Sequence, residues 1–225
     1  MKRLLTAMLL ITSVSAFEAA GQVEFATGYL YSLVSDASRA EDGYRKVEKA
    51  ASDGIYARVS YGSPIGGAFR LRYGVSYYFL TSIDRNYPEV FHDRRYPVIQ
   101  ETGRVTTDEH YISFPVVAGC GMPLFEGVSG FVHAGISLSC CLSSKSYATW
   151  PNVEGTSYWN SDHFAKDTNY NGYRRFDVGL SFGIGLKIKH RVSLDCGIEQ
   201  GILDRSEAAG SLRSFYWLFG ASYSF

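Results

Sequence analysis

The clearest pattern in the chain is a strict alternation of apolar and polar positions over residues 213–225. A period of two residues is typical of a β-strand with one apolar and one polar face. Here the apolar face is mostly aromatic and consists of Phe215, Trp217, Phe219, Ala221, Tyr223 and Phe225. The pattern predicts a terminal strand whose aromatic face and free edge must both be covered by a neighbour.

The same alternation predicts seven further strands. They lie at residues 23–34, 55–62, 68–79, 110–119, 128–142, 176–188 and 192–199. In the third of them Arg70 and Arg72 share the polar face, and two arginines on one strand cannot both face lipid cheaply. That face is therefore expected to form the interior of a closed sheet.

The connections between the predicted strands alternate in length. The long ones cover residues 35–53, 82–107, 143–172 and 204–212, and short turns fall at residues 63–67, 121–127 and around residue 190. This asymmetry and the even strand count favour an all-β fold, an eight-stranded antiparallel up-and-down transmembrane β-barrel. The long connections would be extracellular and the short ones periplasmic, with residues 22–225 forming one barrel domain.

The first residues carry two positive charges, an apolar run over residues 4–14 and a small side chain at Ala16. This arrangement is typical of a secretory signal peptide and is too short to be relied on as a membrane-spanning helix. Residues 1–16 are predicted to be the signal, and cleavage after Gly21 is the alternative. The later uncharged stretch, residues 127–144, alternates and is diluted by Gly and Ser, which disfavours a transmembrane helix.

Composition narrows the classes further. The 22 basic and 22 acidic side chains give a net charge of zero, so the chain has no basic footprint for nucleic acid. The spacing of the four cysteines predicts free thiols on strand faces rather than disulfides, and it does not match a zinc site. No metal or cofactor is expected. The cysteines are Cys120, Cys140, Cys141 and Cys196.

The polar faces of four predicted strands carry charges of opposite sign. The cations are Arg58, Arg70 and Arg72, and the acids on strands across the barrel are Asp177, Asp195 and Glu199. An eight-stranded barrel is just wide enough to be filled by side chains. We therefore expect the two groups to pair across a filled lumen that does not conduct.

Several segments resemble known families. They are HYISFPVVAG at residues 110–119, FDVGLSFGIGLK at 176–187, SLDCGIEQGI at 193–202 and the aromatic end. On these motifs the chain resembles the PorT-like and OmpX-like outer-membrane β-barrels of Gram-negative bacteria. The resemblance implies a location in the cell outer membrane, with lipid and the barrel insertion machinery as partners. Tyr223 and the final Phe225 resemble the terminal signal that such barrels present to this machinery.

These features favour a non-enzymatic barrel with a surface-interaction, structural or secretion-assembly role. Trp150, Tyr158 and Trp159 in the longest connection are candidate contacts for an extracellular or secretion-system protein. One alternative is a barrel enzyme that acts on membrane lipid, although histidines such as His133 have no spacing that fixes a catalytic triad. The other alternative is a soluble lipocalin-like ligand carrier.

Overall fold

The computed structural model describes residues 21–36, 50–66, 68–90, 100–152, 155–162, 164, 174–189, 191–205 and 212–225. Within these residues no helix is long and apolar enough to cross a membrane. The strands are β1 (Gln22–Asp36), β2 (Ala50–Gly66), β3 (Phe69–Val90), β4 (Gln100–Phe125), β5 (Val128–Asn152), β6 (Gly155–Asp162), β7 (Phe176–Ile188), β8 (Val192–Gly201), β9 (Leu212–Arg213) and β10 (Phe215–Ser224).

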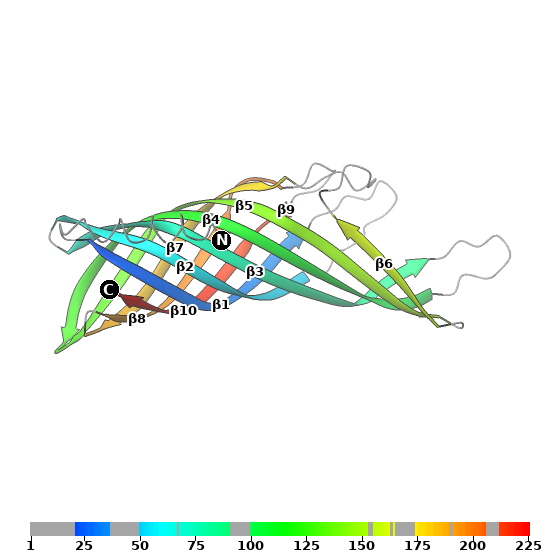
Figure 1. Ribbon diagram of the computed structural model, residues 1–225, viewed down its shortest axis with the longest axis horizontal. Helices are drawn as coiled ribbons and strands as arrows, with labels where there is room; N and C mark the ends of the chain where they lie inside the picture. The colour runs from blue at the N-terminus through cyan, green and yellow to red at the C-terminus, as the bar shows by residue number, and fades with distance from the viewer. Residues whose placement is uncertain are drawn as a thin grey trace, which may run out of the picture.

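Eight of these strands form a closed ring, which Figure 1 shows from the side. Going round the ring, β1, β2, β3, β4, β5, β7, β8 and β10 follow chain order, and each is antiparallel to its neighbours. The ring closes where β10 pairs with β1, from Glu24 opposite Ser224 to Ser32 opposite Tyr216. The predicted eight-stranded antiparallel barrel is confirmed, and closure leaves the terminal strand without a free edge.

The ring has two different ends. At the turn end, short connections join β2 to β3, β4 to β5 and β7 to β8, and the backbone N–H of Phe225 donates to the carbonyl of Val23 (2.9 Å). At the opposite, hairpin end, β3 to β6 continue far beyond the ring on the right of Figure 1. There Val90 lies opposite Gln100, and Asn152 lies opposite Gly155.

The hairpin end corrects four predictions. Residues 35–53, 82–107, 143–172 and 204–212 were expected to be loops. They contain the end of β1 and the start of β2, the ends of β3, β4 and β5, all of β6, and Leu212 of β9. Beyond the ring the strands have no apolar bilayer on one side, so their sequence loses the alternation that marks a strand. Their backbone hydrogen bonding continues without it, and β4 reaches 26 residues.

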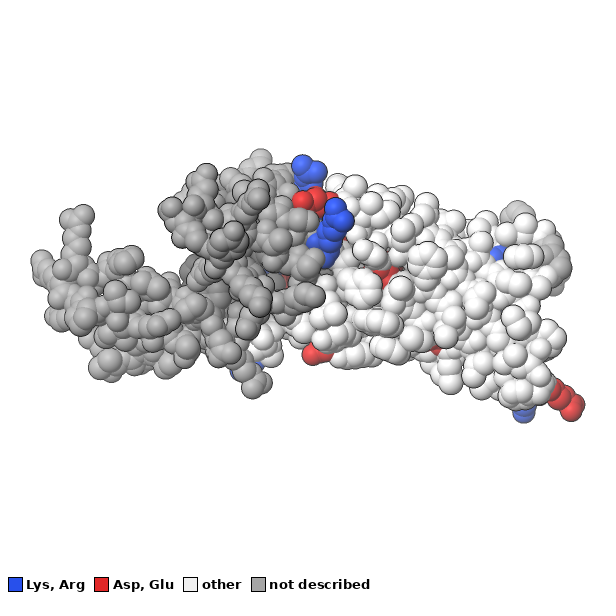
Figure 2. Space-filling view, turned by 180° about the vertical axis from the view of Figure 1, so that it is seen from behind, with Lys and Arg blue, Asp and Glu red and all other residues white. Residues whose placement is uncertain are grey.

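The two faces of the ring differ as predicted. On β10, Trp217 and Phe219 are exposed outward, whereas Tyr216 and Leu218 are buried inward. Exposed apolar side chains continue round the outside, and one face of the molecule is largely free of charged side chains in Figure 2. The ten residues of β8 and of β10 match the 9–11 that a tilted transmembrane strand needs. The barrel therefore presents an outer apolar surface suited to lipid.

Candidate functional site: the barrel lumen

Four tyrosines from four ring strands cross the middle of the lumen. Tyr56 on β2, Tyr78 on β3, Tyr216 on β10 and Tyr111 on β4 are all buried. Their ring centroids are 6.3 Å apart from Tyr56 to Tyr78, 6.0 Å from Tyr78 to Tyr216 and 6.4 Å from Tyr216 to Tyr111. We call these residues the tyrosine chain. Because an eight-stranded ring leaves room only for side chains, the tyrosine chain obstructs the lumen.

A buried carboxylate holds the middle of this chain in place. Glu199 on β8 accepts hydrogen bonds from the Ser137 hydroxyl (2.6 Å) and from the Tyr78 hydroxyl (3.1 Å). Ser139 stands at 3.5 Å from the same carboxylate and donates to Ser113 at 3.0 Å. Hydroxyl donors from two other strands, β3 and β5, therefore satisfy a charge that would otherwise be costly to bury.

Arg205 closes the hairpin end of the lumen. It follows β8, is 4% exposed, and its Nη1 donates to the Tyr111 hydroxyl at 2.7 Å. Its Nε donates to the carbonyl of Arg174 at 3.3 Å, and its guanidinium stacks 5.0 Å from the centre of the Tyr111 ring. Sequence reasoning missed this residue, because a single arginine in a polar segment without periodicity carries no signal of burial.

The predicted acids lie inside the ring but do not all meet the predicted arginines. Asp177 accepts from the Ser214 hydroxyl (2.5 Å) and from the backbone N–H of Leu203 (3.2 Å). Asp195 lines a small inner cavity together with Arg58 and Glu199. The structure thus brings one predicted arginine near two of the predicted acids.

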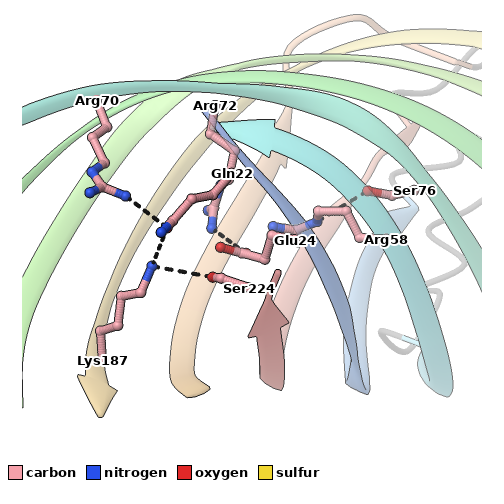
Figure 3. A network of polar contacts seen from close by, with 8 residues as sticks. All are labelled: Gln22, Glu24, Arg58, Arg70, Arg72, Ser76, Lys187 and Ser224. Atoms are coloured by element: carbon pink, nitrogen blue, oxygen red, sulfur yellow. Dashed lines mark hydrogen bonds and ion pairs between the residues drawn. The ribbon is translucent and has the colours of Figure 1, made fainter. Parts of the chain in front are cut away.

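The predicted arginines occupy three different environments, shown in Figure 3. Arg58 is buried, donates to Ser76 Oγ at 3.2 Å and lies 5.3 Å from the centre of the Tyr56 ring. Arg72 forms an ion pair with Glu24 on β1, with Nη1 and Oε1 2.9 Å apart. Arg70 is exposed at the turn end and donates to Gln22 at 3.1 Å.

Direct cross-lumen ion pairing was therefore the wrong prediction. Among the described residues, Arg58, Arg70 and Arg72 form no ion pair with Asp177, Asp195 or Glu199. Strand parity predicts which face a side chain occupies, but the stagger of the strands sets its height along the barrel axis. Arg70 and Arg72 lie at the turn end at the height of Gln22 and Glu24, whereas Asp177 lies toward the hairpin end beside Ser214.

The sequence also places the chain in a family. Residues 19–206 match the family described as outer membrane protein beta-barrel domain. The chain belongs to this family. The match covers the described strands from β1 to β8, and the ring closes with β10. The protein is thus an outer-membrane β-barrel and is located in the cell outer membrane.

The chain is also similar to several solved structures, all at low sequence identity. Ail, the attachment invasion locus protein of Yersinia pestis, is 19% identical with a TM-score of 0.36, covering 92% of this chain and 100% of that chain. Neisserial surface protein A is 16% identical with a TM-score of 0.45 and the same coverage. OprG from Pseudomonas aeruginosa is 8% identical with a TM-score of 0.45, covering 92% of this chain and 96% of that chain. No match is found among curated proteins.

The remaining predicted residues of this outer-membrane barrel lie at its two ends. Trp150, Tyr158 and Trp159 belong to β5 and β6 rather than to a loop. At the turn end, the rings of Tyr223 and Phe225 pack edge to face with centroids 5.0 Å apart, and Phe225 is 77% exposed. Their roles as surface contacts and insertion signal stay predictions.

The cysteines and His133 are the remaining side chains that the sequence singled out. Cys120, Cys140, Cys141 and Cys196 are all free thiols, with Cys141 buried. In the described ranges no group of three or more His, Cys, Asp or Glu side chains could hold a metal ion. His133 lies inside the ring, with its ring stacked on Phe131 at 6.1 Å between centroids.

Proposed function

We propose that this outer-membrane barrel is a non-enzymatic, non-conducting anchor that presents the extended hairpins outside the cell as a contact surface for another protein. The observation that carries the proposal is the contrast between an obstructed lumen and a long sheet that continues past one end of it. A secretion-assembly component would use the same surface toward a partner in its own membrane. The narrower resemblance to PorT-like and OmpX-like barrels is compatible with either role.

The extended sheet supports the contact surface. Beyond Ser82, the last residue of β3 paired with β2, β3 stays paired with β4 as far as Val90. β4 in turn pairs with β5 up to Thr149, and β5 pairs with β6. Backbone pairing, with one register shift between Asp84 and Tyr87, holds four strands together outside the ring, which offers a partner more ordered backbone than an isolated loop would.

The placement of the ends supports the orientation. Small outer-membrane barrels have short periplasmic turns and longer extracellular connections. The short connections of this ring lie at the end that holds Gln22 and Phe225, and the long hairpins lie at the other. In this orientation the tyrosine chain and Arg205 separate the hairpin end from the turn end.

The contact role is tested by trimming the hairpins. A variant that lacks residues 85–104 and 147–160, each replaced by a two-residue Asn-Gly turn, keeps the ring strands and their register. We expect this variant to reach the outer membrane in the folded, heat-modifiable form. On whole cells it should no longer crosslink to the proteins that crosslink to the intact barrel. An unchanged set of crosslinked proteins would contradict the proposal.

The closed lumen is tested in planar lipid bilayers. We expect purified barrel to give no steady single-channel current, because the tyrosine chain and Arg205 obstruct the path. The Tyr78→Ala and Tyr216→Ala double variant, which removes the middle of the chain, serves as the control that reports conduction if the path opens. Steady currents from the unaltered barrel would contradict a closed lumen.

A further inference from the structure

A pocket of about 450 Å³ lies in the turn end of the lumen. Its wall joins residues from β1, β3 and β7, which carry charge, to residues from β4 and β5, which are mostly apolar. Arg70 and Met122 at its rim are exposed, so the pocket is reached from the turn end. We call it the turn-end pocket. The tyrosine chain lies deeper in the barrel, so the pocket is a dead end rather than part of a channel.

Positive charge dominates the lining. Arg70, Arg72 and Lys187 face the pocket, and Glu24 is the one carboxylate among its lining residues. Glu24 already forms an ion pair with Arg72, with Oε1 and Nη1 2.9 Å apart. Among the described residues neither Arg70 nor Lys187 forms an ion pair. Two of the cations that line the pocket therefore have no carboxylate bound to them in the described part of the chain.

Gln22 shows how these two cations are held. Its Oε1 accepts from Arg70 Nη1 at 3.1 Å and from Lys187 Nζ at 3.0 Å, and Lys187 also donates to Ser224 Oγ at 3.2 Å. Figure 3 shows the two side chains converging on Gln22 from opposite strands. A neutral amide oxygen positions the cations without neutralising them, so they remain available to an anion.

Two buried polar atoms, one from each wall of the turn-end pocket, have no hydrogen-bond partner among the described residues. They are Nη2 of Arg72 and Nδ1 of His133, and both residues line the turn-end pocket. Nη1 of the Arg72 guanidinium pairs with Glu24, so the atom without a partner is Nη2 of the second amino group. An unpartnered guanidinium N–H inside a protein is costly, and an oxyanion is the group that satisfies it best.

The opposite wall, formed by β4 and β5, is mostly apolar and indicates that the ligand also carries an apolar group. Val117 is buried there, and Met122 and Phe131 stand beside it. A bare inorganic anion would satisfy the cations but would leave this apolar surface in contact with water. From the two walls together, we propose that the turn-end pocket binds a small organic oxyanion, a carboxylate or phosphate monoester that carries a compact apolar group.

The test uses phenyl phosphate and the refolded barrel in neutral maltoside micelles, measured by isothermal titration calorimetry. We expect one-to-one binding that weakens about a hundredfold in the Arg70→Gln and Lys187→Gln double variant, since each of the two lost charge-assisted contacts costs about a factor of ten. Phenol, which lacks the charge, should not bind at the site. Inorganic phosphate, which lacks the ring, should bind more weakly than phenyl phosphate.

Lys189→Gln is the matched control. Lys189 lies two residues from Lys187, is exposed in the β7–β8 turn and does not line the pocket. We expect this variant to change affinity by no more than about twofold, the size of a screened long-range effect. Equal affinity of the unaltered protein and the double variant, an equal loss in Lys189→Gln, or no saturable binding would overturn the proposal. Arg70→Gln alone, at an exposed position, preserves the test if the double variant does not fold.

Discussion

The Tyr56 side chain lies directly against Gly220, and a β-carbon added at position 220 would overlap its hydroxyl group. Gly220 on β10 is paired with Gly28 on β1, where an added β-carbon would be 2.8 Å from the Tyr56 ring. The seam that closes the barrel is thus free of side chains on its inner face at this height. The space is filled by a tyrosine from β2.

Gly220→Ala should lower the free energy of unfolding by about 1 to 3 kcal/mol, the usual effect of overpacking a filled interior. The new methyl group must displace Tyr56, which begins the tyrosine chain. Urea unfolding of the refolded barrel in micelles measures the effect. Gly121→Ala is the control, because its β-carbon would meet the carbonyl of Gly130 at an ordinary 3.7 Å. Equal stabilities of the two variants would mean that Tyr56 moves freely.

The arginines of β3 are expected to differ in their contribution to stability. Arg72→Ala leaves the Glu24 carboxylate, which is 14% exposed, without its partner. We expect a loss of about 3 kcal/mol, at the low end for buried pairs because both side chains retain some contact with water. Arg70→Ala, at an exposed position, should change the stability by less than about 0.5 kcal/mol. The same denaturant titration compares them, and a larger loss at Arg70 would contradict the observed pairing.

Phe225 is expected to act in assembly rather than in stability. Phe225→Ala keeps the backbone hydrogen bond to Val23 but removes the terminal ring, so we expect less folded, heat-modifiable protein in the outer membrane of growing cells. Refolding of the purified variant in micelles should be unchanged. Phe176→Ala removes another exposed aromatic ring, from the start of β7, and should assemble normally. Similar losses in both variants would indicate a general need for outer aromatic rings.

The orientation of the barrel predicts which epitopes are accessible. An epitope inserted after Asn152, in the β5–β6 hairpin, should be labelled by antibody on intact cells. An epitope inserted after Ile65, beside the β2–β3 turn, should be labelled only after the outer membrane is permeabilised. The reverse pattern would mean that the hairpins face the periplasm.

The ring was predictable from the sequence because the bilayer imposes a simple pattern on it. Wherever a strand separates lipid from lumen, successive residues face lipid and lumen in turn. The sequence therefore alternates between apolar residues and small or polar ones. Phe219 and Leu218 illustrate the rule, since they are adjacent, both apolar, and lie on opposite sides of the wall. Position parity, rather than polarity alone, was the reliable signal.

The interior was less predictable. Parity correctly placed Arg72 inside, but its partner proved to be Glu24, because the height of each residue depends on strand stagger that no local pattern encodes. Arg205 was missed because its burial depends on where the segment after β8 folds relative to Tyr111, 94 residues earlier. The hairpin extensions were missed because hydrogen-bonded strands surrounded by water on both faces need no hydrophobic alternation.

The wall of this barrel is not of even height. β3, β4 and β5 are neighbours in the ring and have 22, 26 and 25 residues, whereas β7, β8 and β10 on the other side have 13, 10 and 10. An even cylinder would look the same from every direction in the plane of the membrane, whereas this barrel has a high side and a low side. A second membrane protein that approaches the low side, formed by β7, β8 and β10, meets only the ends of short strands. One that approaches the high side, formed by β3, β4 and β5, meets the extended sheet. Lateral encounters therefore depend on rotation about the membrane normal, and side-on contacts form at preferred angles.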